Sequence, residues 1–136
     1  MWNENFTLAN GTTVDNGATA WSIAAGGTAP ASASVNSNAF QVNSNNNASE
    51  TWTSQSIDIS AYPSGVNLSA ALTETGTLES DDSINVYYKL NGGALTLFSS
   101  NGSKGNDFGS VTATNPVIIG STVQIIVKFR FGPSSP

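Results

Sequence analysis

The sequence contains no cysteine and no histidine among its 136 residues. Their absence excludes disulfide bridges, a Cys nucleophile, a Ser-His-Asp triad and an ordinary zinc site. Charge is also sparse, with 4 basic residues, 9 acidic residues and a formal net charge of −5. Nucleic acids require a dense basic footprint, so we expect no nucleic-acid partner.

Long hydrophobic segments are missing as well. No apolar run reaches the roughly 18 residues of a membrane-spanning helix, and the opening residues MWNE lack the pattern of a signal peptide. We therefore expect no membrane partner.

Gly-rich phosphate-binding loops are absent too. A pair of carboxylates, as in glycoside hydrolases, stays open, but the acids lie mostly near turns, and we expect that the protein is not an enzyme.

The chain does contain many short segments with the alternation of apolar and polar residues that is typical of β-strands. The alternation is cleanest over residues 66–72 and 123–131, which indicates strands with one buried face. Residues 25–38 are poor in bulky side chains, which favours a long surface loop. We expect nine strands, over residues 2–7, 19–24, 39–43, 51–60, 65–73, 83–90, 94–99, 109–114 and 122–131.

These segments predict an all-β fold, a two-layer antiparallel β-sandwich of the jelly-roll type. Residues 1–131 are long enough to bury one core, so we expect a single domain that is monomeric in isolation. Residues 132–136 read GPSSP. Proline and serine do not extend a sheet, and this stretch is interpreted as the start of a linker or as a truncated tail.

Residues 83–90 read SINVYYKL and present two different faces. One parity is apolar and includes Tyr88, whereas the other carries Asn85, Tyr87 and Lys89. Asn91-Gly92-Gly93 follows directly and is the best hairpin signal in the chain. We expect this strand to pair with the next one, and we expect Tyr87 to face solvent.

The strand at residues 122–131 repeats this pattern. Gln124, Lys128 and Arg130 share the parity opposite to its apolar residues. The simplest interpretation is that the cations only solubilise an outer face. The sharper hypothesis is a shallow groove in which Tyr87 is a platform and the polar residues of both strands are donors. Such a surface suits sugars, which present apolar C–H faces and hydroxyl rims.

Trp52 is a second candidate for a binding platform. It lies an odd number of residues from Ile57 and Ile59, so an unbroken strand would turn it away from their apolar face. Trp21 shares the parity of Ile23 and is expected to be buried.

Acidic residues gather at residues 78–83, LESDDS. Calcium prefers six to eight oxygen ligands, so this turn is a candidate calcium site, although its spacing is not that of an EF-hand loop. The alternative is a solvated acidic turn that blocks edge pairing. The candidate ligands are Glu79, Asp81 and Asp82 from the turn, with Glu4 or Asp15 brought in by the fold.

Three stretches, WNENFTLANGTTVDNGATAWSI, ETWTSQSIDIS and TGTLESDDSINVYYKLNGG, resemble jelly-roll accessory domains of secreted bacterial polysaccharide-degrading enzymes, that is, carbohydrate-binding modules. The resemblance covers about residues 2–130. It implies a β-sandwich, often calcium-bearing, that is covalently linked to a catalytic domain. Many such domains hold calcium between an N-terminal acid and a late Asp of the last strand. Glu4 matches the first, whereas no such Asp follows Phe131; either a final strand is missing or the metal uses the 79–82 turn.

The function expected from these observations is a non-catalytic carbohydrate-binding module, secreted or at the cell surface, whose partner is a polysaccharide. An anionic polysaccharide is slightly favoured over a neutral glucan, because Arg and Lys bind carboxylate and sulfate groups. The alternative is a structural or adhesive β-sandwich module of a bacterial cell-surface protein.

Overall fold

The computed structural model describes residues 2–25, 33–42, 49–75, 82–105 and 107–131, and no helix occurs among them. The strands are β1 (Trp21–Ala25), β2 (Ala33–Val35), β3 (Phe40–Val42), β4 (Ser49–Ser54), β5 (Ile57–Asp58), β6 (Val66–Thr73), β7 (Ser83–Leu90), β8 (Leu95–Leu97), β9 (Ser103–Lys104), β10 (Ser110–Ile118) and β11 (Thr122–Arg130). The all-β, antiparallel prediction is confirmed. The predicted tail at residues 132–136 lies outside the described residues, and no described helix could cross a membrane.

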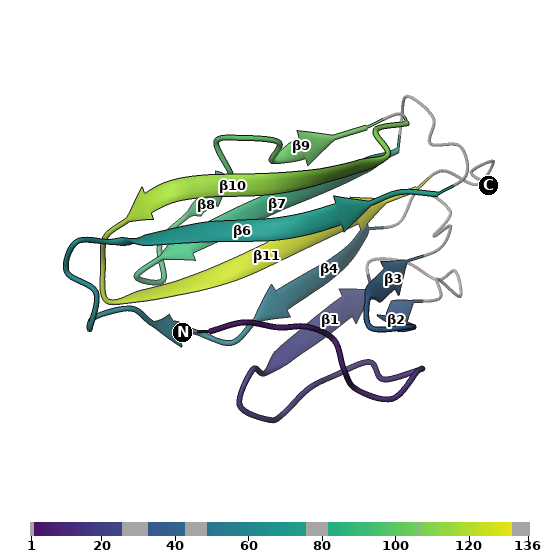
Figure 1. Ribbon diagram of the computed structural model, residues 1–136, viewed down its shortest axis with the longest axis horizontal. Coiled ribbons are helices and arrows are strands. Elements are labelled where there is room, and N and C mark those ends of the chain that lie inside the picture. Colours follow the sequence, from purple (N-terminus) through teal and green to yellow (C-terminus); the bar gives the residue numbers. More distant parts are fainter. Residues whose placement is uncertain (1, 26–32, 43–48, 76–81, 106, 132–136) are drawn as a thin grey trace.

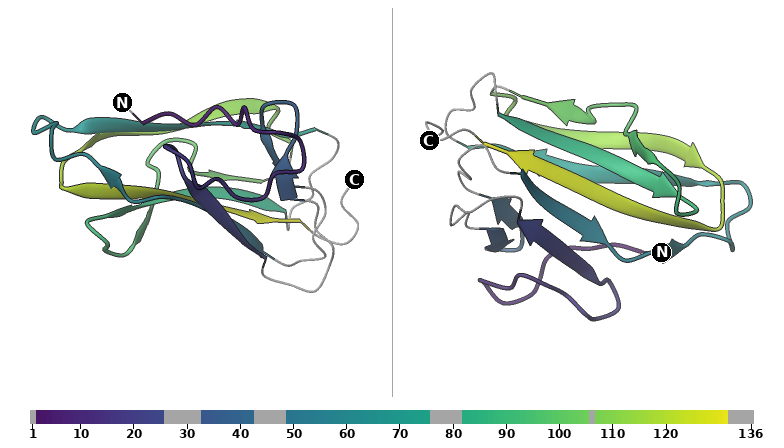
Figure 2. Two further views of the ribbon diagram at one scale, coloured as in Figure 1. Left: turned by 90° about the horizontal axis from the view of Figure 1, so that it is seen from below. Right: turned by 180° about the vertical axis from the view of Figure 1, so that it is seen from behind.

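The strands form two layers (Figures 1 and 2). One layer is a seven-stranded sheet with the order β1-β4-β11-β7-β8, in which β5 also pairs with β11 and β9 also pairs with β7. The second layer holds the two-stranded sheet of β10 and β6, which lies across the inner face of the large sheet. Strands β2 and β3 form a separate small hairpin at one end.

The core lies between the two layers and is built from the apolar parity of each long strand. Ile84 and Val86 of β7 and Val123 and Val127 of β11 meet Leu68 and other residues of the second sheet in one buried cluster. Burying each of these side chains contributes about 1.5–3 kcal/mol relative to leaving it in water. The opposite parity of β7 and β11 must therefore face outward, because successive side chains of a strand alternate.

The predicted hairpin between β7 and β8 is confirmed. Asn91 and Gly92 have φ angles of 53° and 73°, which suits the left-handed positions of a tight hairpin turn. The Gly93 N–H donates a 2.9 Å hydrogen bond to the Leu90 carbonyl. The Asn91 side-chain oxygen also accepts hydrogen bonds from two backbone N–H groups at the start of β11, which ties the turn to that strand.

Two other expectations were wrong. Residues 2–7 form no strand, because Phe6 has a φ of 53° and its N–H is bonded to the Glu4 carboxylate, which breaks the extended conformation. The expected loop at 25–38 contains β2, whose Ala33 and Val35 are buried. Sequence reasoning missed this strand because it is short and its side chains are small.

Candidate binding face

Strands β7 and β11 are neighbours, and their register brings the outward polar residues together. Asn85 lies opposite Lys128, and Lys89 lies opposite Gln124. Residues directly opposite in an antiparallel pair have Cβ atoms about 4.5–5.5 Å apart and point to the same side of the sheet. Tyr87 lies between them in the same parity. The structure thus places these residues on one outward surface, which we call the polar face.

Arg130 lies at the far end of the polar face, opposite Ser83, and it is exposed. With Lys89 and Lys128 it makes three of the four basic residues of the chain. The net charge of the protein is −5, so the positive charge of the chain is concentrated on this surface. Anionic groups would be attracted here despite the overall negative charge, most strongly at low ionic strength.

The ring of Tyr87 interacts with a cation. The Lys128 ammonium nitrogen lies over its ring, 5.6 Å from the ring centroid, which is within the range of a cation–π interaction. Asn85 stands opposite Lys128, and its side-chain oxygen is buried without a hydrogen-bond partner in the described part of the chain. The polar face therefore combines an aromatic ring, a cation that lies over it and a neighbouring amide.

An apolar strip crosses the sheet beside these polar groups. Its members are paired in one row, with Ile126 of β11 opposite Tyr87 of β7, and Tyr87 opposite Leu97 of β8. Ile126 is only 4% exposed, whereas Leu97 is 41% exposed. Leu95 lies opposite Lys89 and is also exposed. Sequence analysis missed the two leucines, although the predicted hairpin already placed them beside Tyr87 and Lys89.

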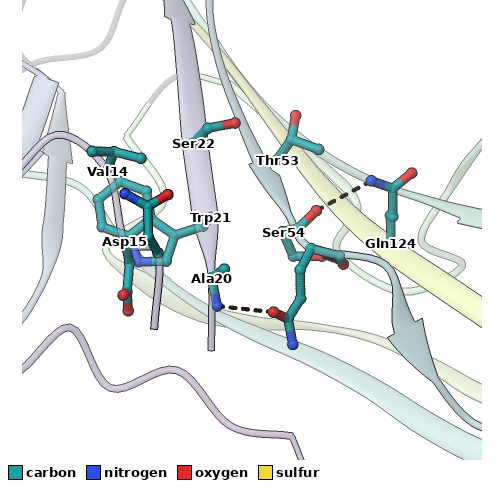
Figure 3. Close-up of a pocket in the computed structure, with 10 residues that line it drawn as sticks. Val14, Asp15, Ala20, Trp21, Ser22, Thr53, Ser54 and Gln124 are labelled. Atoms are coloured by element: carbon teal, nitrogen blue, oxygen red, sulfur yellow. Dashed lines mark hydrogen bonds between the residues drawn. The ribbon is translucent and has the colours of Figure 1, made fainter. Parts of the chain in front are cut away.

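The same row continues across β4 and β1 into a shallow hollow of about 270 Å3 (Figure 3). Thr53 lies opposite Ile126, and Ser22 lies opposite Thr53; both line the hollow, as does Gln124. Gln124 therefore belongs to the hollow and to the polar face. Its side-chain nitrogen donates to the Ser54 carbonyl at 3.2 Å, which fixes the amide at the junction of the two.

Two further residues add a hydrogen-bond acceptor and a hydrogen-bond donor to the lining of the hollow. Asp15 contributes a carboxylate whose Oδ1 accepts the Gly17 N–H at 2.7 Å. Trp21 also lines it, and its indole N–H is buried without a partner among the described residues. Sequence analysis assigned Trp21 to the core, where it is, but gave no reason to expect its ring beside an accessible hollow.

Trp52 does not belong to this face, and its assignment as a binding platform was wrong. It is 5% exposed and lies in the core, opposite Val127 of β11. The expected strand over residues 51–60 is in fact two strands, because β4 ends at Ser54 and β5 begins at Ile57. The break between them cancels the parity argument that turned Trp52 outward.

Among the residues that the structure describes, the predicted calcium ligands do not lie together. Glu4 accepts hydrogen bonds from the Phe6 N–H and the Thr19 hydroxyl, Asp15 closes its own turn, and Asp82 is buried. Glu79 and Asp81 lie outside the described residues. Within the described ranges, no three acidic residues gather as a metal site would require. Calcium at the 79–82 turn stays a prediction.

The pKa values of Glu50 and Asp58 are perturbed, and neither residue lies on the polar face. Burial on the inner side of β4 raises the pKa of Glu50, because a low-dielectric surrounding disfavours the charged form. Hydrogen bonds from the Ser60 hydroxyl and backbone N–H lower the pKa of Asp58. Each is explained by its local structure.

No protein-family model matches the chain, and neither a curated protein nor a solved structure is significantly similar to it.

Proposed function

We propose that the protein is a non-catalytic carbohydrate-binding module of the jelly-roll type. It would be secreted or displayed at the cell surface, and it would hold a covalently attached enzyme on a polysaccharide. The observation that supports this function is the register of β7 and β11, which surrounds the Tyr87 ring with amides and cations on one outward, half-buried surface. The ring offers an apolar surface to the C–H side of a sugar, and the neighbouring side chains match its hydroxyl rim.

The dimensions of the face favour a chain of sugars over a single sugar. One row of paired residues runs from Leu97 through Tyr87, Ile126 and Thr53 to Ser22, across five neighbouring strands. Four strand spacings of about 4.8 Å give a path of roughly 19 Å. A polysaccharide lying across the strands would contact the apolar strip at one end and the hollow at the other. The cations favour a ligand with carboxylate or sulfate groups.

Affinity electrophoresis through gels containing neutral, uronic-acid and sulfated polysaccharides tests this function. We expect retardation by at least one anionic polymer, with a Kd between about 1 μM and 1 mM, that is, about −8 to −4 kcal/mol. Tyr87→Ala and Lys128→Ala should each remove most of the retardation. Tyr62→Ala is the matched control, because Tyr62 is also an accessible tyrosine, 42% exposed, but lies outside the polar face.

The salt dependence of retardation separates the contribution of the cations from that of stacking on Tyr87. If the cations of the polar face contribute, retardation should weaken between low and high ionic strength, whereas stacking on Tyr87 alone should respond little. Wild-type protein that no polysaccharide retards would refute the proposal. Equal retardation of the wild type and Tyr87→Ala would refute the assigned site.

A second candidate function is a structural or adhesive module of a bacterial cell-surface protein. The exposed Leu95 and Leu97 favour it, because neighbouring exposed apolar side chains also mark protein contact surfaces. Sedimentation velocity would show concentration-dependent association through this face in the absence of any sugar. Leu97→Asp should abolish that association if this function is correct.

A further inference from the structure

The second layer has an open edge. Strand β6 pairs with β10 along one side, and no backbone hydrogen bond to its other side is found in the described ranges. The N-terminal residues 2–8 run beside that edge in the same layer (Figures 1 and 2). They alternate between half-buried and exposed positions, yet they form no ladder with β6. An open edge presents unpaired N–H and C=O groups, which is a template for another strand.

A hollow of about 770 Å3 separates this edge from the N-terminal residues. One wall consists of residues 69–73 of β6, and the other consists of Trp2 to Phe6. The floor is formed by inward side chains of the large sheet, including Ile84, Ile125, Val127 and Phe129. The space therefore has the walls of a sheet edge and the floor of a hydrophobic core.

Three buried polar atoms of the hollow's lining residues have no hydrogen-bond partner among the described residues. They are the indole nitrogens of Trp2 and Trp52 and one carboxylate oxygen of Glu74. The other Glu74 oxygen accepts the Gly109 N–H at 2.9 Å. Trp52 is 5% exposed, so water does not readily satisfy its donor. Leaving such groups unpaired is unfavourable, so the polar groups around this hollow are incompletely satisfied.

We propose that this hollow binds an extended β-strand of a partner polypeptide, paired with the free edge of β6. A peptide strand supplies N–H and C=O groups for the edge of β6 and alternate side chains for the apolar floor. Glu4 and Glu74 both line the hollow, and the net charge of the protein is −5. The strand therefore carries a basic side chain at the Glu74 end. An alkyl chain or a sugar would leave the edge of β6 unpaired.

Synthetic peptides test the proposal. The probe is an eight-residue peptide, as long as β6, with alternating valine and threonine and a terminal lysine, acetylated and amidated at its ends. Two control peptides have the same sequence. One carries N-methyl groups on the alternate amides of one edge, and the other carries them on the alternate amides of the opposite edge. Tryptophan emission and calorimetry should show binding of the probe, and at least one N-methylated peptide should bind at least tenfold more weakly. Equal binding of all three peptides, or no binding of the probe, would overturn the proposal.

Matched variants locate the site. Ala70 faces the core from β6, whereas Thr112 is exposed on the neighbouring strand β10 and does not line the hollow. Ala70→Phe should fill the hollow and abolish binding, and Thr112→Phe should leave it unchanged. Glu74→Gln should weaken binding of the lysine peptide about tenfold but not binding of a peptide with threonine in place of lysine. Equal binding by the Ala70→Phe and Thr112→Phe variants would place the peptide elsewhere.

Sedimentation of the protein alone distinguishes the source of the strand. A monomer that binds the probe supports a strand from another protein. A dimer abolished by Ala70→Phe and retained by Thr112→Phe would show that the occupant is a second copy, which would overturn the assigned partner. If Ala70→Phe does not fold, as judged by circular dichroism, the N-methylated peptides alone decide the outcome.

Discussion

Replacing Trp52 with alanine removes an indole from the centre of the core. Trp52 is 5% exposed, and its ring centroid lies 5.9 Å from that of Phe6 and 6.1 Å from that of Trp21. Truncating a buried Trp costs about 3–5 kcal/mol, because the transfer free energy is lost and a cavity remains. Part of this cost, about 0.5–1.5 kcal/mol for each aromatic pair, comes from the two ring contacts. We expect a loss of about 4 kcal/mol in the free energy of unfolding.

That loss is large for a chain of 136 residues. At about 0.05–0.15 kcal/mol per residue, the whole fold is stable by roughly 7–20 kcal/mol. Each kcal/mol shifts the Tm of a domain of this size by about 3–5 °C, so Trp52→Ala should melt at least about 10 °C below wild type. Calorimetry and urea unfolding followed by circular dichroism measure both quantities without relying on tryptophan emission.

Tyr62→Ala and Tyr87→Ala are the comparisons. Tyr62 is 42% exposed, so its loss should change the free energy of unfolding by no more than about 0.5 kcal/mol. Tyr87→Ala should cost about 1 kcal/mol, because it removes one cation–π contact. A Trp52→Ala protein that unfolds within 1 kcal/mol of wild type would contradict the burial argument, and its assignment as a surface platform would have to be reconsidered.

Three further predictions concern single positions. Glu50→Gln should stabilise the protein near neutral pH. The pKa of Glu50 is raised above its ordinary 4.5, so the ionisation of Glu50 opposes folding above the raised pKa. The stability gained by the substitution should vanish below about pH 4.5, where the carboxyl group is protonated in both states. Urea unfolding at about pH 7.5 and about pH 4 checks this, and an equal gain at both would contradict it. Gly102→Ala should lower the free energy of unfolding by about 3 kcal/mol or more, because the added Cβ would overlap the Phe98 carbonyl oxygen; unchanged melting would contradict this close approach of the two backbone segments. Calcium bound at the 79–82 turn should raise the Tm in proportion to the logarithm of its concentration, whereas identical melting in calcium and in chelator would remove the metal.

Much of the large sheet could be predicted from the sequence, because its two central strands are long and unbroken. β7 was predicted with its observed bounds, and β11 was predicted to within one residue. Each has an apolar parity that only a buried face explains, so the opposite parity had to face outward. The sequence could not predict that β7 and β11 are neighbours in the sheet. That depends on non-local pairing, which no local pattern encodes.

Three of the failures share a physical cause, which is a local break in the alternation. The pattern of residues 2–7 is that of a strand, but Phe6 adopts a left-handed conformation that residues other than glycine rarely adopt. The pattern of residues 51–60 is interrupted after Ser54. In β10, Pro116 lacks an N–H and the register shifts between Asn115 and Ile118, so the strand continues beyond the predicted end at 114 by means of a bulge.

The two proposed sites use different parts of the fold and should be independent. The polar face is the outer side of the large sheet, whereas the peptide site lies between the layers at the edge of β6. Tyr87→Ala should therefore leave peptide binding unchanged, and Ala70→Phe should leave retardation by polysaccharide unchanged, because mutations at distant sites without shared partners act additively. Calorimetric titration of each variant with each ligand gives the complete cycle. Coupling of more than about 0.5 kcal/mol would mean that β11, whose outer side carries Lys128 and whose inner side carries Val127 of the hollow, transmits one binding event to the other.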